Sequence, residues 1–328
     1  MTDYRAVPGT VEEAAECCRR VIDEVEKAIV GKRESLLKLM AAFLTSGGHI
    51  LLEDYPGLAK TLIANSFATA LGMDFKRVQF TPDLLPGDIS GGFIYDNRKG
   101  EFVLRKGPLF THILLADEIN RASPKTQSAL LEAMQECQVS LEGEILALQE
   151  PFIVIATQNP IEYEGTFPLP EAQLDRFLVR LSIGYPTLEE EQEILSRRCD
   201  RKQDSVALAT VITPAAFLAM RRVVENVFVE ADIQRYIVQI VEKTRAQRDV
   251  ELGASPRGSL ALLKLARAWA AIHGRDYVIP DDIKLLAPSV LCHRLILEPE
   301  LWGSKKAEQA IVERVIQSVP IPVAPAQP

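Results

Sequence analysis

Short apolar runs alternate with helical patterns through residues 1–184, and this alternation most strongly limits the possible folds. Each run is too short for a buried helix and has the length of a strand buried on both faces. Buried strands separated by helices are typical of a parallel sheet with helices on both sides. We therefore expect an α/β fold with a parallel αβα sheet. The predicted strands are residues 49–52, 78–80, 112–116 and 152–156.

Helical patterns fill the intervals between these runs. Thr10 and Glu13 have capping-box spacing ahead of an amphipathic stretch, which predicts an N-terminal helix. Two hairpins interrupt the alternation, at residues 92–104 and at residues 139–148. Further helices are expected at about residues 35–44, 60–71 and 124–135, the last with Ser123 as its N-cap.

From Thr187 onward the pattern is helical, with almost no strand signal. We therefore place a domain boundary near residues 184–186, so that residues 1–184 form the αβα domain and residues 185–318 form a helical lid domain. Residues 319–328 contain four prolines, which predicts an extended or disordered tail. After the helix that opens at Thr187, helices are expected at about residues 213–226, 231–248, 256–273 and 280–293.

Composition and charge argue against several classes of protein. Hydrophobic residues make up 47% of the chain and charged residues 25%, which argues against a disordered chain. No apolar stretch approaches the roughly 18 residues of a membrane span, and no signal peptide opens the sequence, so a cytoplasmic protein is expected. The net charge of −8 argues against nucleic-acid binding through bulk charge. The five cysteines show no C-x-x-C spacing, so neither a disulfide framework nor a zinc site is expected.

The loop at residues 53–61, between a predicted strand and a predicted helix, is the sharpest chemical feature. A phosphate-binding loop needs inward N–H groups, a lysine beside the phosphates and a hydroxyl for Mg²⁺, and Lys60 and Thr61 supply the last two. Asp54 and Ala59 stand where the pattern G-x-x-x-x-G-K-[ST] has glycine. A carboxylate near phosphates is unfavourable unless it points outward, so Asp54 is not predicted as a ligand. Alone, the loop is equally compatible with an ordinary turn and a solvated lysine.

Two adjacent carboxylates, Asp117 and Glu118, end the third predicted strand. The carboxyl ends of strands are where α/β sheets bind ligands. Asp117 could hold Mg²⁺ through water, and Glu118 could orient and deprotonate an attacking water. A lone Asp-Glu pair is often only a solvated strand end, but together with Lys60 and Thr61 it predicts a nucleotide site.

Three further polar residues have two possible roles each. Asn159 follows the last predicted strand, where its amide could hold the attacking water or the γ-phosphate, or start an Asn-Pro turn. Arg176 could stabilise a transferring phosphoryl group, in its own subunit or in a neighbour, or form a surface salt bridge with Asp175. Arg257 begins a helix of the second domain, where it could reach the phosphates and couple the domains or remain a solvated first-turn residue.

Taken in chain order, these residues resemble the AAA+ ATPases, and within them the MoxR family. The resemblance covers nearly the whole sequence, from about residue 29 to residue 293. Four stretches are more specific than a general ATPase match. They are FTPDLLPGD at residues 80–88, DEINRA at 117–122, ATQNP at 156–160 and GTFPLPEAQLDRF at 165–177.

The resemblance implies that Lys60 and Thr61 belong to Walker A and that Asp117 and Glu118 form Walker B. ATP and Mg²⁺ are then the expected cofactors, with Thr61 and Asp117 as metal ligands and Glu118 as the catalytic base. Ala59 is similar to a variant that the family tolerates. The other nucleotide-binding residues implied are Val30 and Gly31 at the adenine pocket and Tyr55, Pro56, Gly57, Leu58, Ala59 and Leu62 in the loop.

The same resemblance assigns the remaining catalytic residues. Asn159 would be sensor 1, Arg176 the arginine finger and Arg257 sensor 2. The hairpin after Asp88 would be the helix-2 insert of the family, and the hairpin at residues 139–148 its pre-sensor hairpin.

An arginine finger that acts in a neighbour's site makes hydrolysis depend on assembly, so the resemblance implies a homo-oligomeric ring, expected to be a hexamer. ATP hydrolysis would drive chaperone-like remodelling or maturation of a client protein complex. A von Willebrand factor A domain protein is the partner implied, on a separate chain. Two other functions stay open, the motor subunit of a metal chelatase and a nucleic-acid-acting AAA+ ATPase. A scaffold that only binds ATP is less well supported, because binding alone does not need Glu118 as a base.

Overall fold

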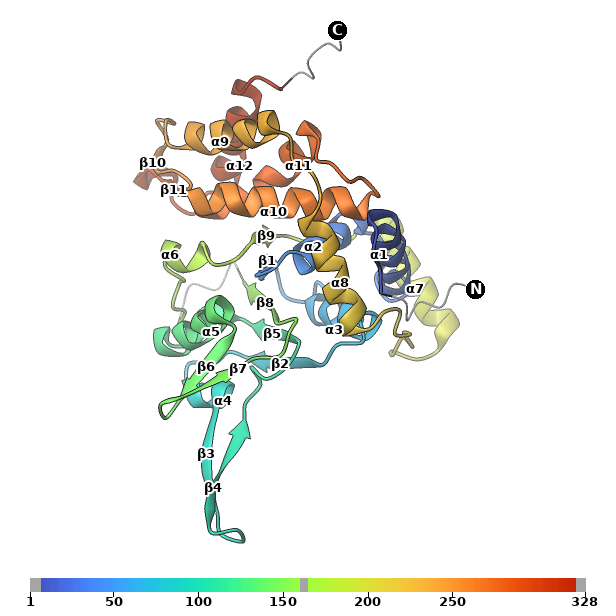
Figure 1. Ribbon diagram of the computed structural model, residues 1–328, viewed down its shortest axis with the longest axis vertical. Coiled ribbons are helices and arrows are strands. Elements are labelled where there is room, and N and C mark those ends of the chain that lie inside the picture. Colours follow the sequence, from blue (N-terminus) through green and yellow to red (C-terminus); the bar gives the residue numbers. More distant parts are fainter. Residues whose placement is uncertain (1–6, 160–164, 323–328) are drawn as a thin grey trace.

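The computed structural model describes residues 7–159 and 165–322, and a five-stranded parallel sheet lies at its centre (Figure 1). The strand order is β2-β5-β8-β1-β9, and every neighbouring pair runs parallel. All four predicted strands are present, so the expected α/β fold is confirmed. The strands are β1 (Ile50–Glu53), β2 (Phe75–Gln79), β5 (Ile113–Asp117), β8 (Ile153–Gln158) and β9 (Val179–Leu181).

The edge strand β9 is the one member of the sheet that the sequence pattern did not reveal. It has three residues and carries the charged Arg180 between two apolar side chains. Such a segment resembles neither a continuous apolar run nor an alternating strand of ordinary length. Pairing with β1 defines it, because Ile50 lies opposite Val179 in the register of the two strands.

Helices cover both faces of the sheet, because successive side chains of a strand point to opposite faces. In β5, Ile113 and Leu115 belong to one apolar core, while Leu114 and Ala116 belong to the other. The first core lies against α1 (Val11–Val25), α2 (Arg33–Leu44) and α3 (Lys60–Ala70). The second core lies against α4 (Pro86–Ser90) and α5 (Pro124–Glu136).

The caps of two helices test the sequence signals directly. The hydroxyl of Thr10 accepts the N–H of Glu13 at 3.3 Å, and the Glu13 carboxylate accepts the N–H of Thr10 at 3.3 Å, so the predicted capping box of α1 is confirmed. Ser123 occupies the N-cap position of α5 but makes no capping hydrogen bond. Its hydroxyl lies 3.2 Å from the hydroxyl of Thr126 instead.

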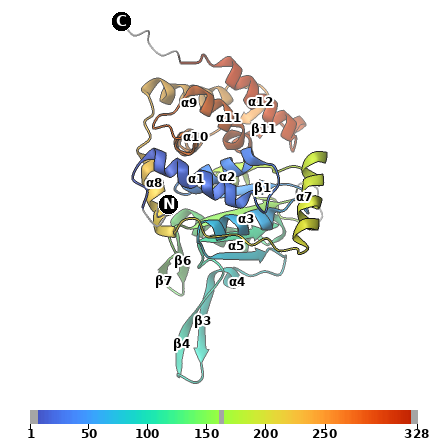
Figure 2. The same cartoon turned by 90° about the vertical axis from the view of Figure 1, so that its right-hand side faces the viewer.

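Both predicted hairpins are present. The first projects far from the sheet (Figures 1 and 2) and consists of β3 (Gly91–Asp96) and β4 (Glu101–Lys106). The second lies beside it and consists of β6 (Gln138–Leu141) and β7 (Glu144–Ala147).

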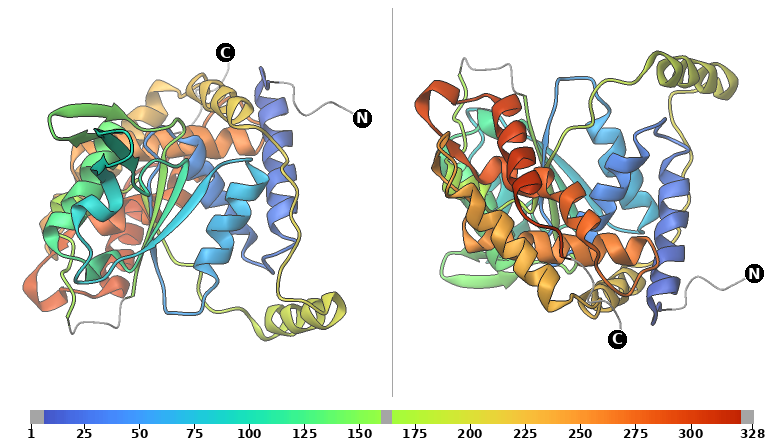
Figure 3. Two further views of the ribbon diagram at one scale, coloured as in Figure 1. Left: turned by 90° about the horizontal axis from the view of Figure 1, so that it is seen from below. Right: turned by 90° about the horizontal axis from the view of Figure 1, so that it is seen from above.

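The helical half of the chain begins with α7 (Leu188–Arg201), which Figure 3 shows at a corner of the molecule and which buries no residue. Four helices stack above the sheet domain (Figure 1), and they are α9 (Ala231–Thr244), α10 (Pro256–Ile272), α11 (Pro280–Leu291) and α12 (Lys305–Ser318). Of these, α10 packs against both α1 and α2. One apolar core therefore runs from the sheet into the lid. The helix α8 (Pro214–Glu225) lies beside the sheet domain, where it packs against α1, α2 and α10.

The sequence pattern missed two parts of this half, which are α12 and the short strands β10 (Val250–Leu252) and β11 (Ile296–Leu297). Val319, the first residue of the predicted tail, is buried in the lid core, and residues 323–328 lie outside the described residues. Among the described residues, every helix is too short or too polar to cross a membrane.

Candidate active site

The loop between β1 and α3 bends through two left-handed backbone conformations. Gly57 has a φ of 84° and Ala59 a φ of 53°. Glycine adopts this region freely and alanine only at a cost, which explains why a glycine is the usual residue at the position of Ala59. The helix begins directly at Lys60, so its first N–H groups and the positive end of its dipole face the loop. Such an end of a helix favours an anion.

The ammonium group of Lys60 binds the backbone at the start of this loop. Its Nζ donates hydrogen bonds to the backbone carbonyls of Asp54, at 2.8 Å, and Tyr55, at 3.1 Å. Partial burial lowers the pKa of Lys60, while the charge of Asp54 and those of the two strand-end carboxylates oppose the shift. A cation thus lies beside the N–H groups that begin α3.

Asp54 points away from the loop, in keeping with its exclusion from the predicted ligands. Its carboxylate accepts hydrogen bonds from the hydroxyl of Ser182 at 2.6 Å and from the backbone N–H groups of Ile183 at 2.6 Å and Gly184 at 3.1 Å. Asp54 is 4% exposed, and its three hydrogen-bond donors compensate the burial of its charge. Asp54 therefore anchors the loop to the segment that follows β9.

Asp117 ends β5 with both carboxylate oxygens engaged. Oδ1 accepts a hydrogen bond of 2.6 Å from the hydroxyl of Thr157, at the end of the neighbouring strand β8. Oδ2 accepts from the guanidinium of Arg77 on β2, at 2.6 Å from Nη2 and 3.1 Å from Nε. These contacts from both sides fix the direction of the carboxylate.

Glu118 has a φ of 56°, a conformation that is uncommon for a residue other than glycine and that often accompanies functional sites. Its backbone N–H donates to the hydroxyl of Thr157 at 2.8 Å. Its Oε2 accepts hydrogen bonds from Gln79 Nε2 at 2.6 Å and from Arg121 Nη1 at 2.9 Å. The side chains of Gln79 and Arg121 thus hold the second carboxylate, and Thr157 holds the backbone that carries it.

One cavity of about 450 Å³ lies at the carboxyl ends of the strands, and we call it the strand-end cavity. Its lining includes Lys60, Asp117 and Glu118 together with Arg77, Gln79 and Thr157. Asn159 also lines it and is 7% exposed, whereas Pro160 of the predicted motif lies outside the described residues. The hydroxyl of Thr61 and the carboxylate of Asp117 are hard oxygen donors on the same cavity, a donor set that fits Mg²⁺. The loop contributes Pro56, Gly57, Leu58 and Ala59 to the lining, and the start of α3 contributes Lys60, Thr61 and Leu62.

Residues 30–31, the predicted adenine segment, connect to the loop through a chain of contacts. The side chain of Glu190 fills the space beside Gly31 and pairs with Lys32 at 3.3 Å. The ammonium group of Lys32 donates to the carbonyl of Tyr185 at 2.7 Å, and the Tyr185 ring stacks on Tyr55 with 5.8 Å between centroids. The segment therefore lies near the start of the loop, and its contact with adenine stays a prediction.

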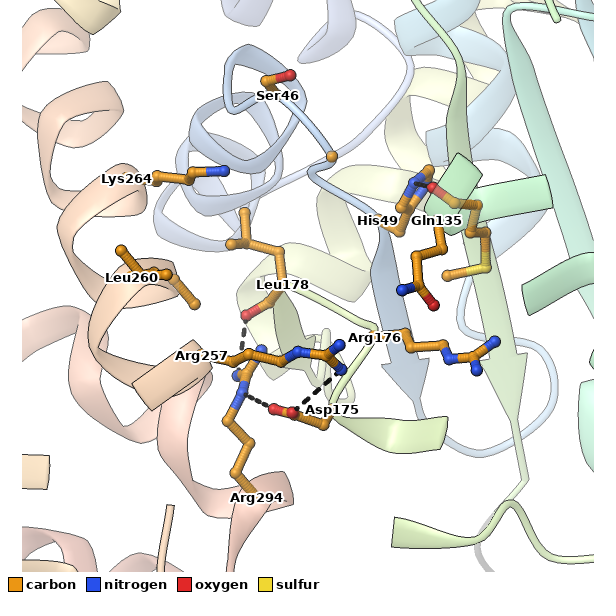
Figure 4. A pocket seen from close by; sticks show the side chains of 13 residues that line it. Ser46, His49, Gln135, Asp175, Arg176, Leu178, Arg257, Leu260, Lys264 and Arg294 are labelled. Carbon is orange, nitrogen blue, oxygen red and sulfur yellow. Dashed lines mark hydrogen bonds and ion pairs between the residues drawn. The ribbon is translucent and has the colours of Figure 1, made fainter. Parts of the chain in front are cut away.

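Arg176 and Arg257 line a different cavity, of about 330 Å³, which we call the arginine cavity (Figure 4). Its lining includes His49, directly before β1, and Leu178, directly before β9, whose N–H donates to the His49 carbonyl at 2.8 Å. The arginine cavity thus lies at the amino ends of these strands, whereas Lys60 follows the carboxyl end of β1. Since β1 has four residues, these two edges are about 13 Å apart at about 3.3 Å per residue.

The acidic neighbour of Arg176 does not pair with it. Asp175 Oδ1 accepts from Arg294 Nε at 2.8 Å, and Asp175 Oδ2 lies 3.7 Å from Arg257 Nη1. The side chain of Arg176 makes no hydrogen bond or ion pair with residues 7–159 or 165–322, and Figure 4 shows it extending away from Asp175, below Gln135. The alternative of an Asp175–Arg176 salt bridge is therefore wrong. Arg257 is partly solvated, with 56% of its side chain exposed.

Sequence reasoning missed four residues that hold these sites together. Arg77 and Gln79 stand two apart on β2, and the register places Gln79 beside Asp117, so polar residues at the end of a neighbouring strand were a usable signal. Thr157 follows Ala156, which pairs with the residue before Asp117, so the strand register could also have revealed it. Arg294 gave no signal, because a single arginine in a helical region has no distinctive pattern.

Two parts of the chain match known families. Residues 49–179 match the family described as "ATPase family associated with various cellular activities (AAA)", and residues 242–315 match the family described as "AAA lid domain". The first match contains Lys60, Asp117, Asn159 and Arg176, and the second contains Arg257.

Several relatives are similar over nearly their full length. The chain is 50% identical to Uncharacterized protein YeaC of Bacillus subtilis, over 93% of this chain and 94% of that protein. It is 42% identical to Chaperone MoxR1 of Mycobacterium tuberculosis, over 99% of this chain and 88% of that protein. The magnesium-chelatase 38 kDa subunit of Acidiphilium rubrum is more distant, at 31% identity over 60% of this chain and 57% of that protein.

A solved structure extends the likeness to three dimensions. The crystal structure of a candidate ATPase from Cytophaga hutchinsonii superposes with a TM-score of 0.87 at 40% identity, and covers 95% of this chain and 97% of that one. The family matches, the relatives and the shared fold lead to one conclusion. The chain belongs to the MoxR family of AAA+ ATPases.

Proposed function

We propose that this protein hydrolyses ATP within a homo-oligomeric assembly and that the hydrolysis drives chaperone-like remodelling of a partner protein. The observation that carries the proposal is the position of the two cavities at opposite edges of one sheet. One chain has a phosphate loop and two carboxylates at one edge and Arg176, without a partner among the described residues, at the other. A second copy that brings its arginine cavity to this strand-end cavity would place a phosphate loop, two carboxylates and an arginine around one nucleotide.

Each residue of the strand-end cavity has a proposed task. Lys60 and the first N–H groups of α3 bind the phosphates. Glu118 accepts the proton of the attacking water, and Asn159 orients that water. Thr61 and Asp117 hold Mg²⁺, which when bound neutralises charge on the phosphate oxygens.

Other residues of the same region bind the rest of the nucleotide in this proposal. Residues 30–31 contact the adenine ring, and the backbone of the loop between β1 and α3 encloses the phosphates. The residues assigned to ATP binding are Tyr55, Pro56, Gly57, Leu58 and Ala59 in the loop and Leu62 in α3.

Two of the three arginines that line the arginine cavity, Arg176 and Arg257, act on the site of a neighbour. Arg176 is the arginine finger, which stabilises charge on the transferring phosphoryl group, and Arg257 is sensor 2. Their shared cavity, about 13 Å from the carboxyl edge of their own β1, supports action in trans for both. We propose a closed ring of six copies, the assembly implied by the resemblance.

The partner is proposed from the relatives and from the family. The name of the M. tuberculosis relative, Chaperone MoxR1, supports a remodelling role, and a von Willebrand factor A domain protein is the proposed partner. We retain the cytoplasm as the location and residues 1–184 and 185–318 as the two domains. The distant match to a chelatase subunit and the net charge of −8 make the chelatase and nucleic-acid alternatives weaker.

A complementation experiment tests the ATPase proposal. Arg176→Ala and Lys60→Ala should each be nearly inactive alone, and mixing them should restore activity, because a mixed assembly pairs an intact loop with an intact finger. An arginine finger is worth about 10³–10⁵ in rate in well-studied hydrolases. Arg235→Ala, which removes an arginine that is 70% exposed on α9, is the matched control and should keep the wild-type rate.

The proposal is wrong if mixing restores nothing at any ratio while light scattering shows that the two variants co-assemble. The client is tested separately, by affinity isolation with Glu118→Gln in the presence of ATP. That variant should retain a bound partner that Lys60→Ala does not retain. A partner set identical for both variants would contradict ATP-driven remodelling.

A further inference from the structure

The arginine cavity contains a charge arrangement that the trans reaction does not itself require. Arg294, whose side chain is 3% exposed, binds Asp175 Oδ1 through Nε at 2.8 Å. The other oxygen of Asp175 lies 3.7 Å from Arg257 Nη1 and 3.4 Å from the hydroxyl of Ser255. One carboxylate thus joins a buried arginine of the lid to an arginine at the cavity surface (Figure 4).

Arg294 also holds the chain on the other side of Arg176. Its guanidinium donates to the backbone carbonyls of Phe177 at 2.6 Å and Leu178 at 3.2 Å. A further hydrogen bond to the carbonyl of Val290 fixes the same guanidinium to the end of α11. The planar fork of arginine suits several acceptors at once. Residues directly before and directly after Arg176 are therefore attached to one side chain of the lid.

Asp175 is the one acidic residue among the described residues that line the arginine cavity. Arg176, Arg257, Lys264 and Arg294 bring four positive charges to the same lining. A single carboxylate between Arg294 and Arg257 reduces the repulsion that would otherwise separate these groups. Its contact with Ser255, the N-cap of α10, also fixes the helix that carries Arg257.

We propose that Asp175 and Arg294 form a positioning pair that holds Arg176 and Arg257 in one orientation, so that both reach the same phosphates of a neighbouring copy. This inference rests on the proposed function and deepens it. Neither member of the pair touches ATP, since Asp175 has the same sign of charge as phosphate and Arg294 is buried. Their contribution is geometric, and a misplacement of about 1 Å at a reacting centre can cost about 10²-fold in rate.

Asp175→Asn tests the pair, because asparagine keeps the shape and removes the charge. The variant should bind ATP with wild-type affinity, since its own strand-end cavity is unchanged, and should hydrolyse ATP about 10- to 100-fold more slowly. Mixing it with Lys60→Ala should restore activity. Mixing it with Arg176→Ala should restore none, because both variants damage the same face of the subunit.

Asp249→Asn is the matched control, because Asp249 pairs with Arg314 at 2.8 Å within the lid and contacts neither cavity. It should keep the wild-type rate. Three results for Asp175→Asn would overturn the inference, namely an unchanged rate, a loss of ATP affinity, or rescue by both mixing partners. If Lys60→Ala rescues neither Asp175→Asn nor Arg176→Ala, the proposed function itself is wrong. If Lys60→Ala rescues Arg176→Ala but not Asp175→Asn, only the positioning role is wrong.

Arg294→Lys supplies the second variant should Asp175→Asn fail to fold. Lysine keeps the charge but lacks the fork that spans Asp175 and the carbonyls of Phe177 and Leu178. The rate should fall about 3- to 10-fold, with the same pattern of rescue by Lys60→Ala and not by Arg176→Ala. A wild-type rate for Arg294→Lys would overturn the positioning role.

Discussion

The hydroxyl of Thr157 donates a hydrogen bond of 2.6 Å to Asp117 Oδ1 and so joins the ends of β8 and β5. The hydroxyl oxygen of Thr157 also accepts the backbone N–H of Glu118 at 2.8 Å. Thr157 is 1% exposed, so water cannot readily replace either bond. One buried hydroxyl therefore positions the carboxylate proposed for metal binding and the backbone of the residue proposed as the catalytic base.

Thr157→Val should slow ATP hydrolysis about tenfold or more and lower the free energy of unfolding by about 1–3 kcal/mol. Valine has nearly the same shape as threonine but leaves the N–H of Glu118 without its acceptor, and a buried unsatisfied group costs about that much. Single-turnover hydrolysis and urea unfolding measure the two effects. Thr157→Ser, which keeps the hydroxyl, should retain most of the activity. Equal rates for Thr157→Val and the wild type would contradict the role of the hydroxyl.

Glu118→Gln should keep ATP binding and lose at least about 10² in hydrolysis rate, the lower end of what a positioned general base contributes. The carboxamide is nearly isosteric with the carboxylate but cannot accept the proton of water. Titration with a fluorescent ATP analogue gives the affinity, and phosphate release gives the rate. A rate within a few-fold of wild type would show that another group is the base.

Lys60→Ala should abolish ATP binding. The variant loses the one side-chain cation of the loop between β1 and α3, together with the bonds that Nζ makes to the carbonyls of Asp54 and Tyr55. Lys284→Ala, which removes a partly exposed lysine paired with Asp281, is a control that should bind ATP normally. Equilibrium titration with the fluorescent analogue distinguishes the two variants. An unchanged affinity for Lys60→Ala would show that the phosphate-binding loop has been assigned to the wrong residues.

The sequence was sufficient for the strands that carry the strand-end cavity, because β1, β5 and β8 are apolar runs that end in polar residues. Asp117 ends β5, while Lys60 and Asn159 follow the ends of β1 and β8, and the common direction of parallel strands brings them together. Residues that contribute only through register were not found. Thr157 and Gln79 gain their contacts from the pairing of neighbouring strands, and pairing is a property of the folded sheet.

The arginine cavity was the least predictable part of the molecule. Its charged side chains come from the segment before β9 and from the lid, so their distance in the sequence gives no indication of contact. Arg176 and Arg257 were identified by resemblance, and their grouping depends on how α10 packs over α1 and α2. Arg294 reaches Asp175 across 119 positions of sequence, and no local pattern could predict such an ion pair.

His49 is buried at the amino end of β1 in one fixed neutral form. Its Nε2 donates to the carbonyl of Met134 at 2.9 Å, because its Nδ1 accepts the backbone N–H of Val154 at 3.1 Å. Protonation would place a second proton on Nδ1, where the N–H of Val154 already points. Burial lowers the pKa of His49 to about 4; the hydrogen bond to Met134 opposes this shift and the charge of Arg221 adds to it.

We therefore expect acid to destabilise the protein through His49. Its pKa is about 6.5 in the unfolded chain, so between pH 6.5 and about 4 the unfolded chain binds a proton that the folded chain does not. The free energy of unfolding then falls as the pH is lowered through this window, by about 1.4 kcal/mol per pH unit and about 3 kcal/mol in all. His49→Gln can keep both hydrogen bonds but cannot ionise, so its stability should decline less steeply.

Urea unfolding of both proteins at several pH values between about 7.5 and 4.5 measures the difference in slope. The buried His293, whose pKa burial also lowers, is present in both proteins, so the difference between them isolates His49. The two stabilities should run parallel above pH 6.5 and converge or cross below it, as the wild type loses the contribution of the neutral imidazole. Parallel lines throughout the range would show that His49 does not titrate in this window, and the folded state would then have to accommodate the imidazolium beside Val154 and Arg221.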